Sequence, residues 1–270
     1  MSPASALDPT AAWAHLAPHQ VRHPVQSIAP DSPRSPGALR VVCISDTHGM
    51  HEQVPVPPGD ILLHTGDLTG TGAPAELRAL ADWLGSQPHT HKVVIAGNHD
   101  LTLHVDYYRS AWRRFHRRAR PFDAEAIRHR FVSDDRFTYL EDGLVELGGL
   151  RIYGSPWQPT FYDWAFNLDR GAPIAAVWDR IPRDVDILLT HGPPLGRGDL
   201  CVSGQRAGCL DLLKAVQGRV RPRFHVFGHI HEGYGATSDG HTTYINASTC
   251  TVQYQPRQPP FVFDVLPQRK

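Results

Sequence analysis

Short apolar runs alternate with amphipathic segments from Leu39 onward. The runs are rich in β-branched residues, as expected for buried strands, and they predict strands over residues 39–45, 60–65, 92–96, 150–153, 185–190, 224–227, 242–247 and 261–265. The segments between them repeat apolar residues at helical spacing and predict helices over 75–86, 106–118, 174–180 and 208–218. Strands that alternate with helices indicate an α/β fold with a largely parallel sheet.

The first part of the chain lacks this pattern. Residues 1–38 are rich in Pro, Ala, Ser and His, and Pro30, Pro33 and Pro36 interrupt any regular element. We therefore expect residues 1–38 to form a disordered leader and residues 39–270 to form a single domain. A docked strand or arm is the alternative, because three positions there are apolar: Val21, Val25 and Ile28.

Composition narrows the class of protein. Of the 270 residues 41% are apolar, and Lys plus Arg and Asp plus Glu both total 27, so neither nucleic acid nor an anionic membrane is indicated as a partner. No apolar stretch is long enough to cross a bilayer, and the first residues lack the features of a signal peptide. The four cysteines show no CxxC spacing, and Cys43 lies in an apolar run. We expect a buried free thiol there and a cytoplasmic protein.

Polar motifs follow the strands in a fixed order. They are Asp46-Thr47-His48, Gly66-Asp67, Gly97-Asn98-His99-Asp100, Thr190-His191-Gly192 and Gly228-His229-Ile230-His231. Loops at the carboxyl ends of parallel strands converge, so these residues can share one pocket. Carboxylate and amide oxygens mixed with imidazoles, without cysteine, suit two divalent ions bound side by side. The motifs predict metal-assisted hydrolysis of phosphate esters.

Individual motifs have ordinary alternatives, such as a helix-capping Asp or a turn Asp in a Gly-rich loop. We expect Asp46 and His48 to point to the same side of an extended strand end, and His229 and His231 to pair in the same way. His99 can point into the site without being a ligand and protonate a leaving alkoxide. The shared order favours the metal site, and the sequence has no P-loop, nucleophile elbow, HExxH or paired CxxC motif.

The ordered motifs resemble those of the calcineurin-like metallophosphoesterase superfamily. Longer segments are similar to its metallophosphoesterase-domain-containing subfamily, among them Gly154-Ser-Pro-Trp-Gln-Pro, Leu189-Thr-His-Gly-Pro-Pro-Leu-Gly and His225-Val-Phe-Gly-His-Ile-His-Glu-Gly-Tyr-Gly. The resemblance covers residues 39–266. It implies a four-layer α/β/β/α sandwich with a dimetal site at the carboxyl ends of the strands.

The resemblance also implies roles for single residues. By motif position, the first ion would be held by Asp46, His48 and His231, and the second by Asn98, His191 and His229, with Asp67 bridging. The ions would be divalent, commonly Mn²⁺, with Fe, Zn or Ni in some members. His99 matches the non-ligand histidine of the family, and with Asn98 it would contact substrate.

The implied activity is that of a phosphodiesterase acting on cyclic nucleotides or related small diesters, which are cleaved by a metal-bridged hydroxide. Protein phosphatases of the superfamily follow Gly-Asp with Asp-Arg-Gly, whereas this chain has Gly66-Asp67-Leu68-Thr69-Gly70-Thr71-Gly72. That difference disfavours phosphoprotein substrates and leaves His99 without a motif-assigned partner. A phosphomonoesterase and a slow-turnover nucleotide-binding protein are the alternatives.

Aromatic residues near the motifs are candidates to stack a nucleobase. Trp157 and Tyr234 lie in loops bounded by Gly and Pro and are our preferred pair; Phe161, Tyr162 and Trp164 also flank the motifs. Core packing is the alternative for each. The basic segment 113–120 is expected to be a solvated helix face, so we expect a small phosphoester or nucleotide, and not nucleic acid, as the partner.

Overall fold

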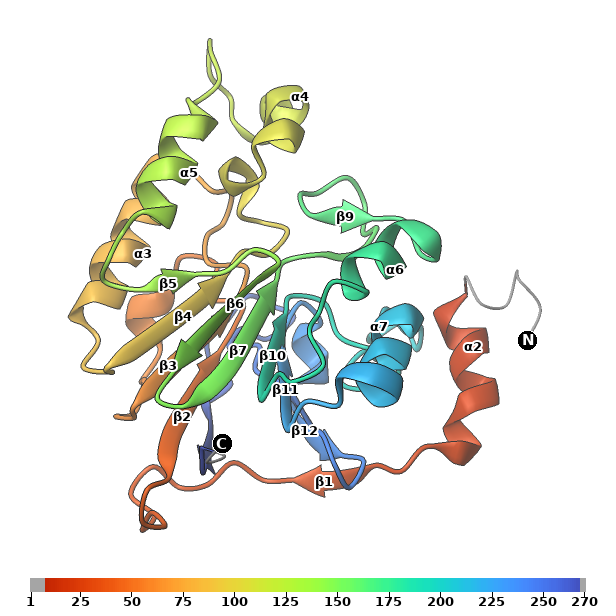
Figure 1. Ribbon diagram of the computed structural model, residues 1–270. Helices are drawn as coiled ribbons and strands as arrows, with labels where there is room; N and C mark the ends of the chain where they lie inside the picture. The colour runs from red at the N-terminus through yellow and green to blue at the C-terminus, as the bar shows by residue number, and fades with distance from the viewer. Residues whose placement is uncertain (1–7, 268–270) are drawn as a thin grey trace.

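Two β-sheets packed face to face form the centre of the computed structural model, which describes residues 8–267 (Figure 1). The seven-stranded sheet has the order β1 (His23–Val25), β12 (Gly235–Ser238), β13 (Thr243–Asn246), β11 (Phe224–Phe227), β10 (Ile187–Thr190), β7 (Leu150–Ser155) and β6 (Gly143–Leu147). The five-stranded sheet has the order β14 (Phe261–Val265), β2 (Leu39–Ile44), β3 (Ile61–Thr65), β4 (His91–Ile95) and β5 (Thr138–Tyr139). A short pair, β8 (Gln158–Pro159) and β9 (Asn167–Leu168), stands apart from both sheets.

The central strands of both sheets pair in parallel, as the sequence predicts. In one sheet β2, β3, β4 and β5 are parallel, and in the other β7, β10, β11 and β13 are parallel. The strands β14, β6, β12 and β1 add antiparallel pairs at the edges. Parallel strands bring their carboxyl ends to one side of a sheet, which is where the polar motifs lie.

The inner faces of the two sheets form a shared apolar core. Leu63 and Ile95 of the five-stranded sheet and Ile152, Leu189 and Val226 of the other are all fully buried in it. Their neighbours along the strands face the outer helices, so the strands are buried on both sides. This explains why they appear in the sequence as continuous apolar runs.

Helices cover the outer face of each sheet (Figure 1). One layer consists of α3 (Pro74–Ser86), α4 (Val105–Phe115) and α5 (Ala124–Val132), and the other contains α6 (Ala172–Trp178) and α7 (Leu210–Ala215). Leu77, Leu80 and Leu84 of α3 are buried against the five-stranded sheet, and Trp178 and Leu212 belong to the core of the opposite layer. The four-layer α/β/β/α architecture is therefore confirmed.

All eight strands and four helices predicted from the pattern form, with ends displaced by a few residues. The helix expected over 208–218 is α-helical only as far as Ala215 and continues as a π-helical turn, Val216–Val220. Helix α5 escaped prediction because only Ala124 and Phe131 are buried, too few to give a clear period. The edge strand β6 and the strand β12, which lies next to the edge strand β1, are partly exposed, so they lack a strong apolar signal.

The expectation of a disordered leader over residues 1–38 is wrong for the part that the structure describes, and residues 1–7 lie outside it. Asp8 caps helix α2 (Pro9–Leu16) by accepting hydrogen bonds from the backbone of Thr10 and Ala11. Strand β1 then pairs with β12. This pairing is the docked strand that the sequence suggested as the alternative, because Val25 is apolar. The proline-rich residues 26–38 carry no helix or strand.

Helix α2 is held by Trp13. Its indole is 6% exposed and packs with Leu195, Leu210 and Leu213, while the guanidinium groups of Arg22 and Arg206 lie 5.2 and 4.8 Å from the ring centroid. One aromatic side chain that fits a distant pocket shows no periodicity, which is why the sequence pattern did not predict this docking.

Two further expectations concern cysteines and membranes. All four cysteines are free, and Cys43 is fully buried, as predicted. Among residues 8–267 no helix combines the length and the apolar character that crossing a membrane requires.

Candidate metal centre

The polar motifs meet where the central strands of both sheets end. Asp46, Asp67 and Asn98 follow β2, β3 and β4, and His191 and His229 follow β10 and β11. Their carboxylates and imidazoles form three overlapping groups, in each of which the potential ligand atoms lie within 4.8 Å of one another: Asp46, His48 and His231; Asp67, His191 and His229; and His48, Asp67 and His99. Asn98 joins them through a contact with His191. The structure thus brings all the predicted site histidines, aspartates and the asparagine together.

Tight turns, not extended strands, deliver several of these side chains. Strand β2 ends at Ile44, and Asp46 and His48 have left-handed backbones with φ of 52° and 45°. Asp67, which follows β3, and His229, which follows β11, also have left-handed backbones, with φ of 50° and 68°. The prediction of alternating strand side chains was therefore wrong, although both members of each pair reach the cluster. Such conformations cost roughly 1–3 kcal/mol each and concentrate at functional sites.

The turns are held by hydrogen bonds within the site. The backbone N–H of Asp46 donates to Gly66 O at 2.9 Å, and that of His48 donates to Asp67 O at 3.0 Å. The N–H of His229 donates to the Asp46 carboxylate at 3.0 Å, and the Ser248 hydroxyl donates to the same group at 2.8 Å. Residues from both sheets therefore fix the position of one buried carboxylate.

The first ligand group contains two imidazoles that face each other. Nε2 of His48 lies 3.2 Å from Nε2 of His231, and His231 Nε2 lies 3.5 Å from Asp46 Oδ1. In the second group, His191 Nε2 lies 3.0 Å from Asn98 Oδ1 and 3.4 Å from Asp67 Oδ1.

Asp67 stands between the two groups. Its Oδ1 approaches His191, and its Oδ2 lies 3.8 Å from His48 Nε2. One carboxylate oxygen is thus directed to each group, which is the arrangement expected of a bridging ligand.

Backbone carbonyls set the orientation of two imidazoles. His191 Nδ1 lies 2.9 Å from Thr65 O, and His231 Nδ1 lies 3.0 Å from Thr251 O. A carbonyl only accepts hydrogen bonds, so both Nδ1 atoms carry hydrogen. In the neutral form of each ring, the lone pair of Nε2 faces the cluster. This partner arrangement is typical of metal-binding histidines. The oxygen and nitrogen donors fit two hard or borderline divalent cations.

Electrostatics give the same picture. Burial favours the neutral form of Asp46 and Asp67, but the neighbouring His231 and His191 hold the pKa of each carboxyl well below its usual range. Burial acts against protonated imidazoles, yet the two aspartates raise the pKa of His191 and of His231 to about 9. The buried carboxylates therefore need compensating positive charge, which protons or divalent cations can supply.

His99 finds a partner that no motif revealed. Its Nδ1 donates to the carbonyl oxygen of Gly70 at 2.9 Å, which leaves Nε2 as the free ring nitrogen. Its backbone N–H donates to Asp67 Oδ1 at 2.8 Å. Gly70 belongs to the segment that replaces Asp-Arg-Gly, and its own N–H donates to Glu76 at 3.0 Å. The loop after Asp67 therefore orients His99 through a main-chain oxygen.

Asp100 is a further site residue, and the sequence motifs did not predict a role for it. Its buried carboxylate accepts from the backbone N–H groups of Leu68, Thr69 and Gly97 and from the Thr69 hydroxyl, at 2.7–3.1 Å. Burial and the charge of Asp67 raise the pKa of Asp100 to about 7, although these donors act to lower it. Asp100 ties the loop after β3 to the loop after β4.

The aromatic surroundings differ from the expectation. The Trp157 indole donates to Asp142 at 3.0 Å and packs against His104 and Phe166, and the Tyr234 hydroxyl donates to Pro259 O at 2.8 Å. These contacts anchor both side chains in their loops, and among the described residues neither ring is paired with a histidine of the cluster. Base stacking by Trp157 and Tyr234 stays a prediction.

Three other rings touch the cluster histidines. Phe161 lies 5.1 Å from His229, Trp164 lies 4.1 Å from His99, and Tyr254 lies 4.7 Å from His48, measured between ring centroids. The sequence points to Phe161 and Trp164 as aromatic residues that could stack a nucleobase, but it does not predict a role for Tyr254. Tyr254 lies in the polar loop between β13 and β14, well after the last motif in the sequence. No sequence motif near it indicates a functional role.

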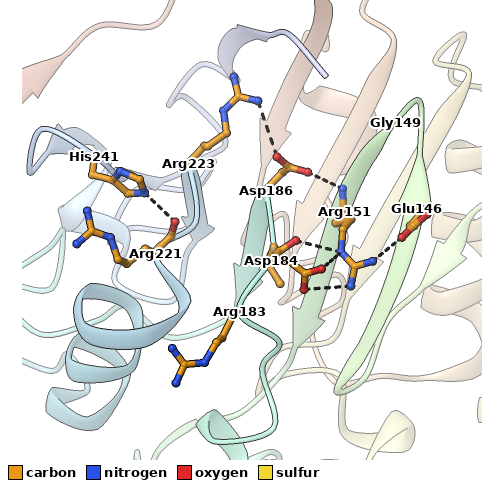
Figure 2. A pocket seen from close by; sticks show the side chains of 10 residues that line it. Glu146, Gly149, Arg151, Arg183, Asp184, Asp186, Arg221, Arg223 and His241 are labelled. Atoms are coloured by element: carbon orange, nitrogen blue, oxygen red, sulfur yellow. Dashed lines mark hydrogen bonds and ion pairs between the residues drawn. The ribbon is translucent and has the colours of Figure 1, made fainter. Parts of the chain in front are cut away.

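A hollow with a volume of about 470 Å³ lies at the amino-terminal ends of β7, β10 and β11, opposite the ends that carry the histidine cluster (Figure 2). Arg151 there pairs with Glu146 at 2.5 Å and with Asp184 at 3.2 Å, and its N–H donates to Asp186 at 2.9 Å (Figure 2). The acids neutralise much of the basic charge, so this network stabilises the strand ends and does not compete with the histidine cluster as the reactive site.

Comparison with known proteins agrees with this geometry. A profile of the calcineurin-like phosphoesterase family matches residues 39–233. The chain is 48% identical over 248 residues to human metallophosphoesterase domain-containing protein 1, covering 89% of this chain and 75% of that protein. It is 41% identical to UPF0046 protein T07D4.2 of Caenorhabditis elegans, covering 96% and 68%.

A solved structure shares the fold at 13% identity, with a TM-score of 0.53 over 77% of this chain and 90% of the other. The ordered ligand motifs, the two-sheet sandwich and the long sequence match lead to one conclusion. The chain belongs to the calcineurin-like phosphoesterase family of metal-dependent phosphoester hydrolases, within its metallophosphoesterase-domain-containing branch.

Proposed function

We propose that this phosphoesterase is a phosphodiesterase that acts on cyclic nucleotides or related small diesters. The observation that carries the proposal is Asp67, whose two oxygens are directed to two separate ligand groups beside His99. The phosphate of a diester carries a single negative charge. Two bound metal ions can neutralise that charge without an additional cationic side chain.

The ligand assignment follows the two groups. Asp46, His48 and His231 would hold one ion, and Asn98, His191 and His229 the other, with Asp67 shared. Mn²⁺ suits these oxygen and nitrogen donors, and Fe, Zn and Ni are the other candidates. Bound divalent ions supply a nucleophilic water at neutral pH and neutralise phosphate oxygens.

His99 is proposed as the general acid. Its Nδ1–H is held by Gly70 O, so the proton to be transferred would reside on Nε2. From that position the imidazolium would donate to the oxygen of the leaving alcohol, a step worth on the order of 10² to 10⁴ in rate. Asn98, next to it in sequence, would contact a phosphate oxygen in addition to its proposed role as a metal ligand.

The loop after Asp67 supports a diester over a phosphoprotein or a simple monoester. The loop has no Asp-Arg-Gly segment. Its Leu68 and Thr69 are buried, and the Thr69 hydroxyl donates to Asp100 at 2.7 Å. No guanidinium is offered by this loop, and a monoester dianion gains most from such an extra cation.

The first test compares hydrolysis of bis(p-nitrophenyl) phosphate and p-nitrophenyl phosphate by the Mn²⁺-supplemented protein, with EDTA as the control. Chelator-sensitive preference for the diester supports the phosphodiesterase and leads to a screen of cyclic nucleotides. Preference for the monoester identifies a phosphomonoesterase. Metal binding without turnover of either ester, together with submicromolar nucleotide affinity, identifies a nucleotide-binding protein.

The four free cysteines fit a reducing compartment, and we propose the cytoplasm as the location.

A further inference from the structure

An aromatic side chain borders each ligand group. Tyr254 lies beside the first group, with its ring centroid 4.7 Å from that of His48 and 5.3 Å from that of His231. Phe161 lies beside the second group and is perpendicular to His229 at 5.1 Å. The two rings come from loops that are remote in sequence, so their common position is decided by the fold.

Tyr254 is held in an unusual conformation. Its φ is 55°, a left-handed backbone that bulky residues rarely adopt. The loop is closed by hydrogen bonds from Tyr254 N–H to Thr251 O at 2.8 Å and from Thr251 N–H to Gln255 O at 2.9 Å. Thr251 O also accepts from His231 Nδ1, so the loop is anchored to a proposed metal ligand.

Tyr254 nevertheless remains 50% exposed. A large ring held at the edge of a charged cluster, and not buried, gains little from packing. Its position therefore suits contact with a ligand.

Phe161 is also partly exposed and lies in a loop held by hydrogen bonds. It is 41% exposed, and its loop is closed by the side chain of Asn167, which donates to Phe161 O at 3.2 Å and accepts from Phe161 N–H at 3.2 Å. Tyr162, 79% exposed, packs edge-on against Phe161 at 4.7 Å. Exposed aromatic groups gathered at a site indicate a binding surface.

We propose that Tyr254 stacks the nucleobase, or an equivalent planar ring, of the phosphoester whose phosphate lies at the ligand cluster, with Phe161 as the second aromatic contact. This inference rests on the proposed function. Stacking uses only the flat face of a base, so it is tolerant of base identity. The substrate class it selects is nucleoside phosphoesters in preference to phosphoesters of open-chain alcohols or sugars.

The test measures binding of AMP and of ribose 5-phosphate to the full-length Mn²⁺-loaded protein by isothermal titration calorimetry. The two ligands share the sugar phosphate and differ in the base. We expect wild type to bind AMP more tightly, and Tyr254→Ala to weaken AMP by roughly 5- to 150-fold while ribose 5-phosphate is unchanged. Tyr254→Phe is the matched control, because it keeps the ring and should keep AMP affinity. Manganese content per chain is measured for every variant.

Phe161→Ala tests the second aromatic contact independently. We expect it to lower the affinity for AMP less than Tyr254→Ala does. Equal affinities of wild type for AMP and ribose 5-phosphate would overturn the stacking inference and leave the phosphodiesterase proposal standing. The same holds if Tyr254→Ala weakens both ligands equally, which would indicate a disturbed metal site. If the Mn²⁺-loaded protein binds neither ligand and hydrolyses no diester, the proposed function itself fails.

Discussion

The indole of Trp164 stacks on the imidazole of His99, with ring centroids 4.1 Å apart and planes inclined by 25°. Phe115 packs against the same indole, with its ring centroid 4.7 Å from that of Trp164. Together with the Gly70 carbonyl, which accepts from Nδ1, the stacked indole restricts rotation of the His99 ring. The position of Nε2, the atom proposed to carry the transferred proton, is therefore set by two groups that do not belong to the ligand motifs.

Removing the His99 imidazole should slow turnover without removing metal. We expect His99→Ala to lower kcat by about 10²- to 10⁴-fold on an alkyl phosphodiester, because the leaving alkoxide then departs unprotonated. The loss should be much smaller on bis(p-nitrophenyl) phosphate, whose leaving group needs little help. Equal rates of variant and wild type on the alkyl ester would exclude the general acid role.

Trp164→Ala tests positioning as distinct from chemistry. The imidazole remains but loses its stacked neighbour, so we expect kcat to fall by roughly 10-fold, less than in His99→Ala, with KM for the diester little changed. Trp164→Phe keeps a stacking ring and should recover most of the rate. If both Trp164 variants behave like wild type, the indole has no part in orienting His99.

Metal binding should stabilise the fold. A ligand present at 100 times its Kd contributes about 2.7 kcal/mol, which corresponds to a rise in Tm of roughly 5–10 °C for a chain of this size. We expect this shift when Mn²⁺ is added to chelator-treated protein in differential scanning fluorimetry. Asp67→Asn, which replaces the shared carboxylate, should lose most of it. An undiminished shift in that variant would show that the ions bind elsewhere.

Docking of the N-terminal helix should contribute to stability. Trp13 is buried between two guanidinium groups, so Trp13→Ala should lower the free energy of unfolding by about 3–5 kcal/mol in urea denaturation. A disordered leader would give no change.

Gly196 offers a coupled test of the same contact. A Cβ at this position would overlap the Trp13 indole, so Gly196→Ala should be destabilising in the wild type. The penalty should be smaller in the Trp13→Ala background, although the left-handed backbone, with φ of 79°, retains some strain. Additive effects of the two substitutions would contradict the contact.

Stability should fall with acidification through buried histidines outside the ligand set. Burial lowers the pKa of His225 to about 3, whereas an unfolded histidine titrates near 6.5. Unfolding therefore takes up a proton between about pH 6.5 and pH 3, and stability present above this window is lost as the pH falls through it. His225→Gln should reduce the pH slope of the unfolding free energy by about 1.4 kcal/mol per pH unit, compared with wild type under identical conditions. Identical slopes would show that His225 is already charged in the folded state.

The sequence alone determined the predicted strands, most helices and which polar residues gather at the candidate site. Short continuous apolar runs, such as those before Asp67 and His191, are typical of strands that are buried on both faces. The run itself is a local pattern, so it can be recognised in the sequence. The polar residue after each run marks a strand end, and parallel strands bring such ends together. The order of motifs therefore sufficed to place Asp46, Asn98 and His229 in one cluster.

The tertiary structure decided how the site is oriented and bordered. His99 is held by a main-chain oxygen of Gly70 and by Trp164, and Tyr254 reaches the cluster from a loop far along the chain. Trp157, which the sequence favoured, turns to Asp142 instead. A backbone carbonyl acceptor cannot be recognised from the sequence, because every residue has one. An aromatic ring in a loop can pack against the protein or remain exposed, and the sequence does not distinguish the two. Contacts between residues remote in sequence depend on how the two sheets and their loops pack, which no local pattern of hydrophobic and polar residues encodes.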